Sequence, residues 1–236
     1  MIVLGIETSG LSGSVALCRE GQCLQLRCLD QPGRRHAQSL VLELRQMLSE
    51  FQIRSSDVNA IAVSRGPGSF TGLRVGLVCA KTFAYVTGCQ FVAVDTFATV
   101  AMNCPPDVTS AWIVDDAQRG DLFAGSYERS EDGHWIQASS IEVVPGEEWL
   151  PTRLATETVV GRGLLRQDLK SLTARCLTAD EIIRPTASAV ARRGEQMLTC
   201  RDMFSEIDFD LWKAVPFYIR PSAAEEQRDK RDATPR

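Results

Sequence analysis

Residues 64–74, with the sequence SRGPGSFTGLR, join an apolar strand pattern at 60–63 to a long apolar helix pattern at 73–86. A glycine-rich turn between a strand and a helix exposes backbone N–H groups at the positive end of the helix dipole, which suits a phosphate or another anion. The other interpretation is a tight, proline-stiffened turn that only reverses the chain. The spacing matches neither GxxxxGK[ST] nor GxGxxG, so the stretch by itself predicts a strand–turn–helix unit and leaves a ligand open.

The N-terminal segment predicts a buried strand followed by a polar turn. Its first residues are nearly all apolar, and further strands are expected at 14–18 and 22–29. An acidic residue, Glu7, ends the first strand, and the turn after it carries the hydroxyl groups of Thr8, Ser9 and Ser12. Such a turn binds a ligand or is a hairpin turn whose hydroxyl groups are satisfied internally, and the residues alone do not decide between the two.

Taken together, four segments carry a resemblance to a known family. They are IETSGLSGSVAL at 6–17, His36 at the head of an amphipathic helix, SRGPGSFTGLRVG at 64–76 and VDTFATVA at 94–101. This set resembles the bacterial TsaB family, also called YeaZ, of the actin, sugar-kinase and Hsp70-like group. The resemblance continues more weakly to residue 220. The chain departs from it at Glu7, where the family often has Asp, at Gln118, where it has Arg, and at Phe123, where it has Tyr.

The resemblance implies an α/β protein with the actin-like ATPase (ASKHA) fold, built from two α/β subdomains with mixed sheets flanked by helices. We expect an N-terminal subdomain at 1–103, a C-terminal α/β subdomain at 104–220 and a disordered, charged tail at 221–236. The apolar periodicity predicts helices at 36–51, from 71 to about Gly88, and from 96, with Asp95 as a cap. Further strands are expected at 90–94, 111–114, 121–127 and 136–143.

Composition narrows the class of protein. The net charge is −4, so no overall basic field draws the chain to nucleic acid. Eight cysteines occur without a CxxC pair, which predicts free buried thiols in a reducing compartment. No signal peptide is recognisable, and no segment reaches the roughly 18–20 apolar residues that span a membrane. We therefore expect a cytoplasmic protein that does not associate with membranes.

The helix expected after residue 70 carries small residues at intervals of four, at Gly72, Gly76, Ala80 and Ala84. Small residues in such a row let another element approach closely, and the spacing alone favours packing inside the chain. The resemblance instead implies a subunit interface built from this helix and the one before it. The residues expected to contact a partner there are His36, Leu40, Leu44, Phe70, Leu73, Gly76, Leu77 and Ala80.

A nucleotide site is the second expectation that the resemblance brings. Actin-like ATPases hold phosphates and magnesium beside an acidic residue and a hydroxyl-rich turn. ATP or ADP would then bind weakly and without turnover. The candidate residues are Glu7, Thr8, Ser9, Ser12, Gly66, Gly68 and Ser69.

Catalytic residues and metal ligands are not predicted. The chain has two histidines, and the position four residues after His36 is Leu40, so no helical pair of imidazoles exists. His134 falls in an expected hairpin turn.

The resemblance implies a non-catalytic subunit of the machinery that makes N6-threonylcarbamoyladenosine (t6A) at position 37 of tRNAs reading ANN codons. Its expected partners are a TsaD-type catalytic subunit in a heterodimer and a TsaE-type ATPase, with a homodimer when it is alone and only indirect contact with tRNA. Two alternatives remain: a metal-dependent peptidase or glycopeptidase, and a small-molecule kinase of the actin-like group. Metal content would test the first and ADP formation the second.

Overall fold

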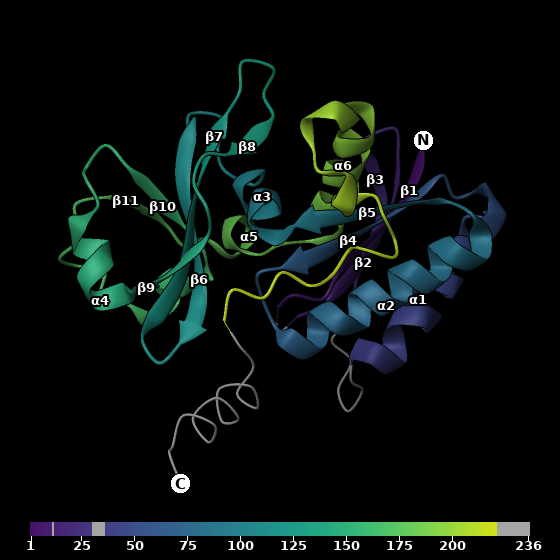
Figure 1. Cartoon of the computed structure of the whole chain (residues 1–236), viewed down its shortest axis with the longest axis horizontal. Coiled ribbons are helices and arrows are strands. Elements are labelled where there is room, and N and C mark those ends of the chain that lie inside the picture. The colour runs from purple at the N-terminus through teal and green to yellow at the C-terminus, as the bar shows by residue number, and fades with distance from the viewer. Residues whose placement is uncertain (11, 30–35, 221–236) are drawn as a thin grey trace, which may run out of the picture.

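The computed structural model describes residues 1–10, 12–29 and 36–220, with the backbone alone for 36–38, and forms two lobes that lie side by side (Figure 1). The tail predicted at 221–236 lies outside the described residues. Each lobe is built on one sheet, and the predicted actin-like fold with two mixed sheets and flanking helices is confirmed. No helix in the described part of the chain is both long and apolar enough to cross a membrane.

The first lobe contains a five-stranded sheet in the order β3-β2-β1-β4-β5. The central strand β1 runs antiparallel to β2 and parallel to β4, which pairs in parallel with β5. The bounds of the five strands are β1 Ile2–Glu7, β2 Ser14–Arg19, β3 Gln22–Cys28, β4 Ala60–Gly66 and β5 Gln90–Asp95. Because β1 and β4 are parallel neighbours, their carboxyl ends bring the two sequence motifs to one edge of the sheet.

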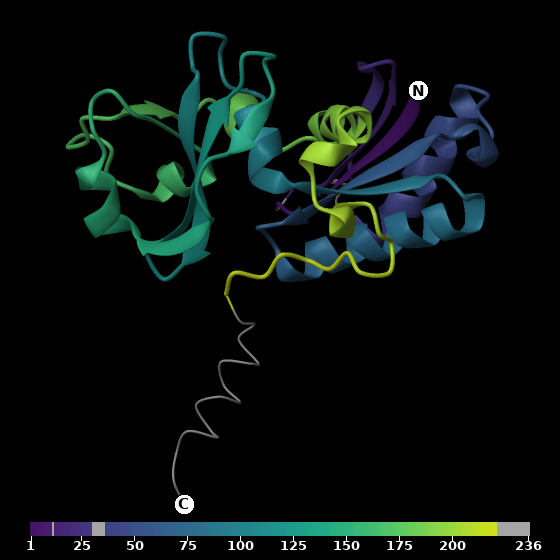
Figure 2. The ribbon, with the colours of Figure 1, turned by 45° about the horizontal axis from the view of Figure 1, so that its top comes forward.

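Helices cover both faces of this sheet, as the two views in Figures 1 and 2 show. Leu4 and Ile6 of β1 pack with α1 (His36–Glu50) and α2 (Phe70–Thr87) on one face. Val3, the alternate residue, packs with α6 (Ala187–Thr199) on the other. A strand buried on both faces must be apolar at every position, which explains the continuous apolar run near the N-terminus.

The second lobe contains a six-stranded sheet in the order β11-β10-β6-β7-β8, with β9 paired to β7. Short helices border it, and α3 with α5 lies between the sheets. The elements are α3 Thr96–Ala101, β6 Ser110–Gln118, β7 Asp121–Arg129, β8 Trp135–Gln137, β9 Glu142–Pro145, α4 Gly146–Trp149, β10 Thr158–Val160, β11 Arg175–Leu177 and α5 Asp180–Ile183.

Most predicted elements are present with ends shifted by one or two residues. Gly88 ends α2 in the left-handed conformation, and Asp95 caps α3 by accepting a hydrogen bond from the N–H of Phe97. The strand predicted at 136–143 is instead two strands, β8 and β9. Between them, the N–H and the hydroxyl of Ser126 donate to the Ser139 hydroxyl in place of regular ladder hydrogen bonds.

The predicted second subdomain, 104–220, needs a correction at its C-terminal end. Helix α6 packs on the first sheet, where Val190 and Ala191 contact the cluster around Val3. The segment after α6 also returns to the first lobe, since the N–H of Phe217 donates to the carbonyl of Arg65. The apolar face of α6 matches the open face of the first sheet, which no other long helix covers in the described structure.

Cysteine burial also differs from the expectation. All eight cysteines are free, and Cys18 and Cys104 are buried, but Cys23 and Cys28 are exposed. Both exposed residues lie on β3, the edge strand of the first sheet. An edge strand has one unpaired side, so its side chains meet solvent more often than those of a central strand.

The small-residue row of α2 faces inward, against the turn that follows β1. The row is buried, and a Cβ atom at position 72 would lie inside contact distance of the Thr8 carbonyl oxygen. At position 76 a Cβ would collide with the Thr8 hydroxyl. The glycines therefore allow the helix to lie directly on the turn.

We expect Gly72→Ala to lower the free energy of unfolding by about 2 kcal/mol, because the added methyl group meets main-chain atoms that cannot move aside cheaply. Chemical denaturation followed by circular dichroism measures the loss. Val78→Ala, on the exposed side of the same helix, is the control and should change stability by less than ~0.5 kcal/mol. Equal effects of the two substitutions would show that the close approach has no energetic importance.

Candidate functional site

Glu7 lies at the carboxyl end of β1 and is fully buried. The N–H and hydroxyl of Ser9 both donate to its Oε1 atom, while Oε2 has no hydrogen-bond partner in the described structure. Burial raises the pKa of the Glu7 carboxyl, and the hydrogen bonds from Ser9 and Ser64 oppose this shift. An orphaned carboxylate oxygen at a strand end is the kind of group that a cation would satisfy.

The structure brings the hydroxyl-rich turn and the glycine-rich loop together, but they bond to each other. The N–H of Ser69 donates to the carbonyl of Ser9 at 2.7 Å, and the Thr8 hydroxyl donates to the carbonyl of Gly72 at 2.8 Å. The N–H of Gly72 is taken by the Ser69 hydroxyl at 3.3 Å, which caps α2. Gly68 packs against Ser9. The backbone N–H groups of Ser69 and Gly72 are thus engaged inside the chain.

Two other predicted site residues have partners outside this contact. The N–H of Gly66 donates to the hydroxyl of Thr96, at the start of α3. The hydroxyl of Ser12 accepts from the guanidinium of Arg184. These residues serve to fix the loop and the turn to neighbouring segments.

An arginine from the second lobe occupies the space facing the turn. Arg162 begins a short 3₁₀ helix at Arg162–Arg166 and forms an ion pair with Asp115 of β6. Its guanidinium also lies against Gly10, where a Cβ atom would collide with Nη1. Arg162 is close enough to Glu7 for its charge to lower the pKa of that carboxyl.

A nucleotide, the group that the fold implies, does not fit this arrangement. Phosphate binding needs free backbone donors at the turn and a cation between carboxylates of the two lobes. Here Ser69 and Gly72 use their N–H groups internally, and the Arg162 guanidinium lies against the turn at Gly10 and forms an ion pair with Asp115. These contacts fill the space between the turn after β1, the glycine-rich loop and the second lobe, and we call them the inter-lobe joint.

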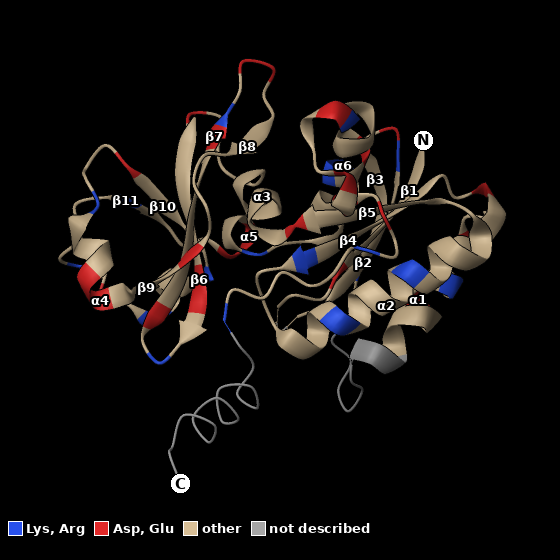
Figure 3. Cartoon of the chain, in the orientation of Figure 1, with Lys and Arg blue, Asp and Glu red and all other residues tan. Residues whose placement is uncertain are grey.

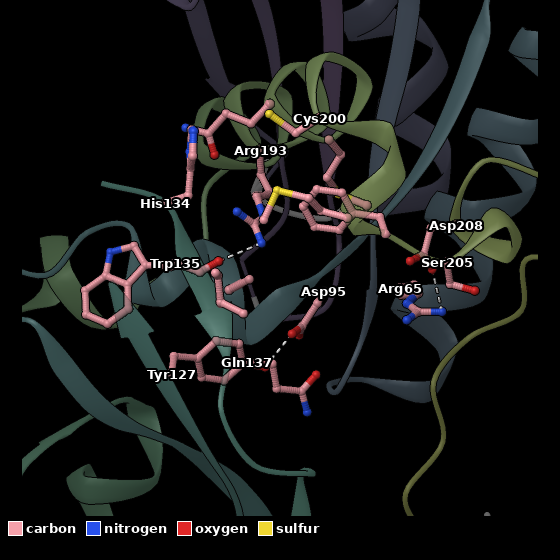
Figure 4. A pocket seen from close by; sticks show the side chains of 16 residues that line it. Arg65, Asp95, Tyr127, His134, Trp135, Gln137, Arg193, Cys200, Ser205 and Asp208 are labelled. Carbon is pink, nitrogen blue, oxygen red and sulfur yellow. Dashed lines mark hydrogen bonds and ion pairs between the residues drawn. The ribbon is translucent and has the colours of Figure 1, made fainter. Parts of the chain in front are cut away.

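A separate cavity of about 280 Å³ lies between the lobes, beside α6 (Figure 4). Tyr127 donates a hydrogen bond to Asp95, and Arg193 donates to the main-chain carbonyl of Trp135 at 2.8 Å. On the opposite wall Arg65 and Asp208 form an ion pair at 2.9 Å.

Burial is the main cause of the altered pKa values around this cavity. It raises the pKa of Asp95 and lowers that of Arg193. Burial, with the nearby Asp95 charge, raises the pKa of Tyr127 well above its ordinary value. Each charged group described here already has a partner. The hydrogen bond from Tyr127 to Asp95 links β7 to β5 and so connects the two lobes.

Sequence reasoning did not predict this cavity, although it named Asp95 as a helix cap and His134 as part of a turn. Arg193 is buried on α6, three residues after Val190 and four before Met197, both of which are in the core. A charged residue at an apolar position of an amphipathic helix is a usable signal of a buried ion or hydrogen bond. No comparable signal marks Asp208.

The two histidines lie in different lobes of the structure. His36 begins α1, and His134 lies in the turn between β7 and β8, as expected. Within residues 1–10, 12–29 and 36–220, no three His, Cys, Asp or Glu side chains are grouped to hold a metal ion.

Most residues predicted to contact a partner are internal. They pack against the first sheet or the turn after β1, so the predicted contact with a partner is wrong for them. These buried residues are Leu40, Leu44, Leu73, Gly76, Leu77 and Ala80. Phe70 is half-buried and stacks on Tyr218 at 4.5 Å between ring centroids. An interface role for Phe70 and His36 stays a prediction.

The opposite sides of α1 and α2 expose apolar side chains. We call this surface the α1–α2 face and define it by Val41, Leu42, Val78, Tyr85 and Val86. The three α2 residues are 64–75% exposed, and Trp212 extends the surface by an edge contact with Tyr85. Large apolar side chains that are exposed on the outer sides of two helices mark a candidate interaction site.

Comparisons with known proteins agree with this structure. The chain is 31% identical, over 95% of its length and 96% of the relative, to the tRNA threonylcarbamoyladenosine biosynthesis protein TsaB of Escherichia coli strain K12. The solved structure of YeaZ from Pseudomonas aeruginosa matches with a TM-score of 0.76 and 25% identity, over 92% of this chain and 99% of that chain.

A second family shares part of the chain. The family model described as tRNA N6-adenosine threonylcarbamoyltransferase, TsaD, matches residues 30–143. A protein of that name from Ruegeria pomeroyi is 38% identical over 70 residues, which are 30% of this chain and 19% of the relative.

The fold and the closed cleft thus define a two-lobed α/β protein of the actin-like class with an apolar outer helical face. Within that class, the chain belongs to the TsaB family, also known as YeaZ.

We expect Mg·ATP to leave the melting temperature of the protein unchanged, because the phosphate position is filled from within. Differential scanning fluorimetry with and without millimolar Mg·ATP measures this directly. A rise of the melting temperature by several degrees would show that the protein binds Mg·ATP, since a ligand stabilises the state that it binds, and would contradict the conclusion that a nucleotide does not fit.

We expect Arg162→Ala to lower the free energy of unfolding by about 2 kcal/mol, because it leaves the buried Asp115 carboxylate without its ion partner. Arg175→Ala is the matched control, since its ion pair with Asp107 is exposed and should contribute less than ~1 kcal/mol. Denaturant titration compares the two variants. Equal losses of unfolding free energy would show that the Arg162–Asp115 ion pair of the inter-lobe joint contributes no more than an exposed ion pair.

Proposed function

We propose that this chain is a non-catalytic subunit that binds a TsaD-type catalytic subunit and orders it for threonylcarbamoyl transfer to adenosine 37 of ANN-reading tRNAs. The observation that carries the proposal is the exposed α1–α2 face on a chain that, in its described part, has no cluster of metal ligands. The TsaB relative is named as a protein of t6A biosynthesis, which supports the substrate assignment.

The docking geometry follows from the shared segment. The TsaD family model covers residues 30–143, which include α1 and α2. Two proteins that carry equivalent helix pairs can pack them about a pseudo-twofold axis, so that each apolar face covers the other. The same geometry with two copies of this chain gives a homodimer when the partner is missing.

Charge favours a partner surface that is apolar with acidic groups beside it. Helix α2 carries Arg74 and Lys81 and has no acidic residue, as the blue segments along it in Figure 3 show. The whole chain has a net charge of −4, so contact with tRNA is indirect and passes through the partner.

The remaining assignments follow from the same proposal. The heterodimer recruits a TsaE-type ATPase, and the protein acts in the cytoplasm, where tRNA is modified. No arrangement of the described residues favours the peptidase or the small-molecule kinase as a second candidate.

Glutamate substitutions on the α1–α2 face should separate binding from folding. Val78→Glu and Tyr85→Glu place a charge where a partner would bury it, so we expect the dissociation constant for a TsaD-type subunit to rise at least ~30-fold, or about 2 kcal/mol. Isothermal titration calorimetry measures the change, and circular dichroism should show an unaltered fold.

Leu165→Glu is the control for these variants. Leu165 is 61% exposed but lies on the second lobe, outside the α1–α2 face. The Leu165→Glu variant should bind the TsaD-type subunit with unchanged affinity. Glutamate at Gly76 or Ala80 would not serve, because both positions are buried and the fold itself would suffer. Unchanged affinity in the Val78 and Tyr85 variants would place the interface elsewhere.

Reconstitution tests the function itself. A TsaD-type subunit, a TsaE-type ATPase, the adenylate-forming synthase, ATP, threonine, bicarbonate and unmodified tRNA are combined with and without this chain. Mass spectrometry of the digested tRNA should detect t6A only when this chain and the TsaD-type subunit are both present. Equal product without this chain would overturn the proposal, and product from this chain alone would make it an enzyme.

A further inference from the structure

The hairpin of β2 and β3 places two cysteines directly opposite each other. Its turn is the dipeptide Glu20–Gly21, both with positive φ (51° and 75°), between the paired residues Arg19 and Gln22. A two-residue turn of this type is closed by a hydrogen-bonded pair, so the next pair, Cys18 and Cys23, is not hydrogen-bonded. Cα atoms in a non-hydrogen-bonded pair are about 4.5 Å apart, which lies at the lower end of the range that a disulfide spans.

A β-bulge produces this register. Leu17 pairs with Gln25, whereas Cys18 pairs with Cys23, so Leu24 is an extra residue on the edge strand. Had the pairing of Leu17 continued unchanged, Cys18 would face Leu24. The inserted residue is what aligns the two thiols.

The two thiols have different surroundings. Cys18 is buried beneath α6, and burial together with the neighbouring Cys23 raises the pKa of its thiol to about 12. Cys23 is exposed on the edge strand. A reagent in solution therefore reaches Cys23 first, and Cys18 is the thiol that can attack from within.

We propose that Cys18 and Cys23 are a redox-active pair that forms an intrachain disulfide when it meets a small-molecule disulfide such as oxidised glutathione. The Cys23 thiolate attacks one glutathione sulfur, the glutathione S–S bond breaks, and one glutathione leaves as a thiolate. Cys18 then attacks the Cys23 sulfur, its proton passes to the departing glutathione sulfur, and the second glutathione leaves as a thiol. Two protein thiols are oxidised and one oxidised glutathione is reduced.

The cross-link would hold the edge strand that anchors α1. Arg27, near the other end of β3, forms ion pairs with Glu43 and Glu50 of α1. A disulfide at the turn end fixes β3 to β2 at Cys18, so opening of the edge strand is restricted. The oxidised protein should therefore exchange the amide hydrogens of residues 22–28 more slowly than the reduced protein.

Peptide mapping of the full chain tests the pair. The reduced protein is incubated with oxidised glutathione at pH 8, blocked with N-ethylmaleimide and digested with trypsin without reduction. Cleavage after Arg19 and Arg27 puts Cys18 in peptide 1–19 and Cys23 in peptide 20–27. We expect these two peptides joined by a disulfide, and separated again by a reductant.

Cys28 provides the internal control. It is exposed on the same strand but lies opposite Ser14, so it has no thiol to react with and should carry only a glutathione mixed disulfide. Cys28→Ser should leave the cross-link intact, and Cys23→Ser should abolish it.

Two outcomes would overturn the proposal. One is persistence of a glutathione adduct on Cys23 without the joined peptides, and the other is joined peptides only in denaturant. Circular dichroism of each variant confirms that the comparison concerns folded protein.

Discussion

The contact between the N-terminal end of α2 and the turn after β1 is the constraint on which the rest of the first lobe depends. Gly72 and Gly76 allow the helix to lie directly on Thr8, and two hydrogen bonds, from Ser69 and from Thr8, fasten the loop to the turn. Any larger residue would lift α2 from the sheet and open the core that it shares with α1. Glycine is unfavourable inside a helix, so its use twice in one row indicates that close packing outweighs helix propensity here.

The same contact decides the chemistry of the cleft. Donors that an actin-like protein would direct at a phosphate are used to join the loop to the turn, and Arg162 supplies the positive charge between Asp115 and Glu7. The guanidinium belongs to the second lobe, where it pairs with Asp115, and it lies against Gly10 of the first lobe, so one side chain contacts both lobes.

Local sequence predicted local structure well and long-range placement poorly. Gly88 and Asp95 mark helix ends because caps are read from neighbouring residues. The Arg162–Asp115 ion pair joins positions 47 residues apart, and no short-range pattern signals it. The position of α6 on the first sheet likewise depends on contacts with residues far away in the sequence, which local sequence does not show. The glycine row of α2 indicated close packing, but internal and external contact have the same spacing.

Helix α2 divides two tasks between its two sides, and this division explains how one helix can serve folding and association. Its inner side, with Gly72, Gly76 and Ala80, is fully used by the turn and the sheet. Its outer side, with Val78, Tyr85 and Val86, has no role in the core. Apolar residues on the outer side contribute little to the stability of the single chain, so an isolated fold gives no reason for their presence. The proposed docking of a second helix pair would supply that reason, because each apolar side chain removed from water then favours the complex.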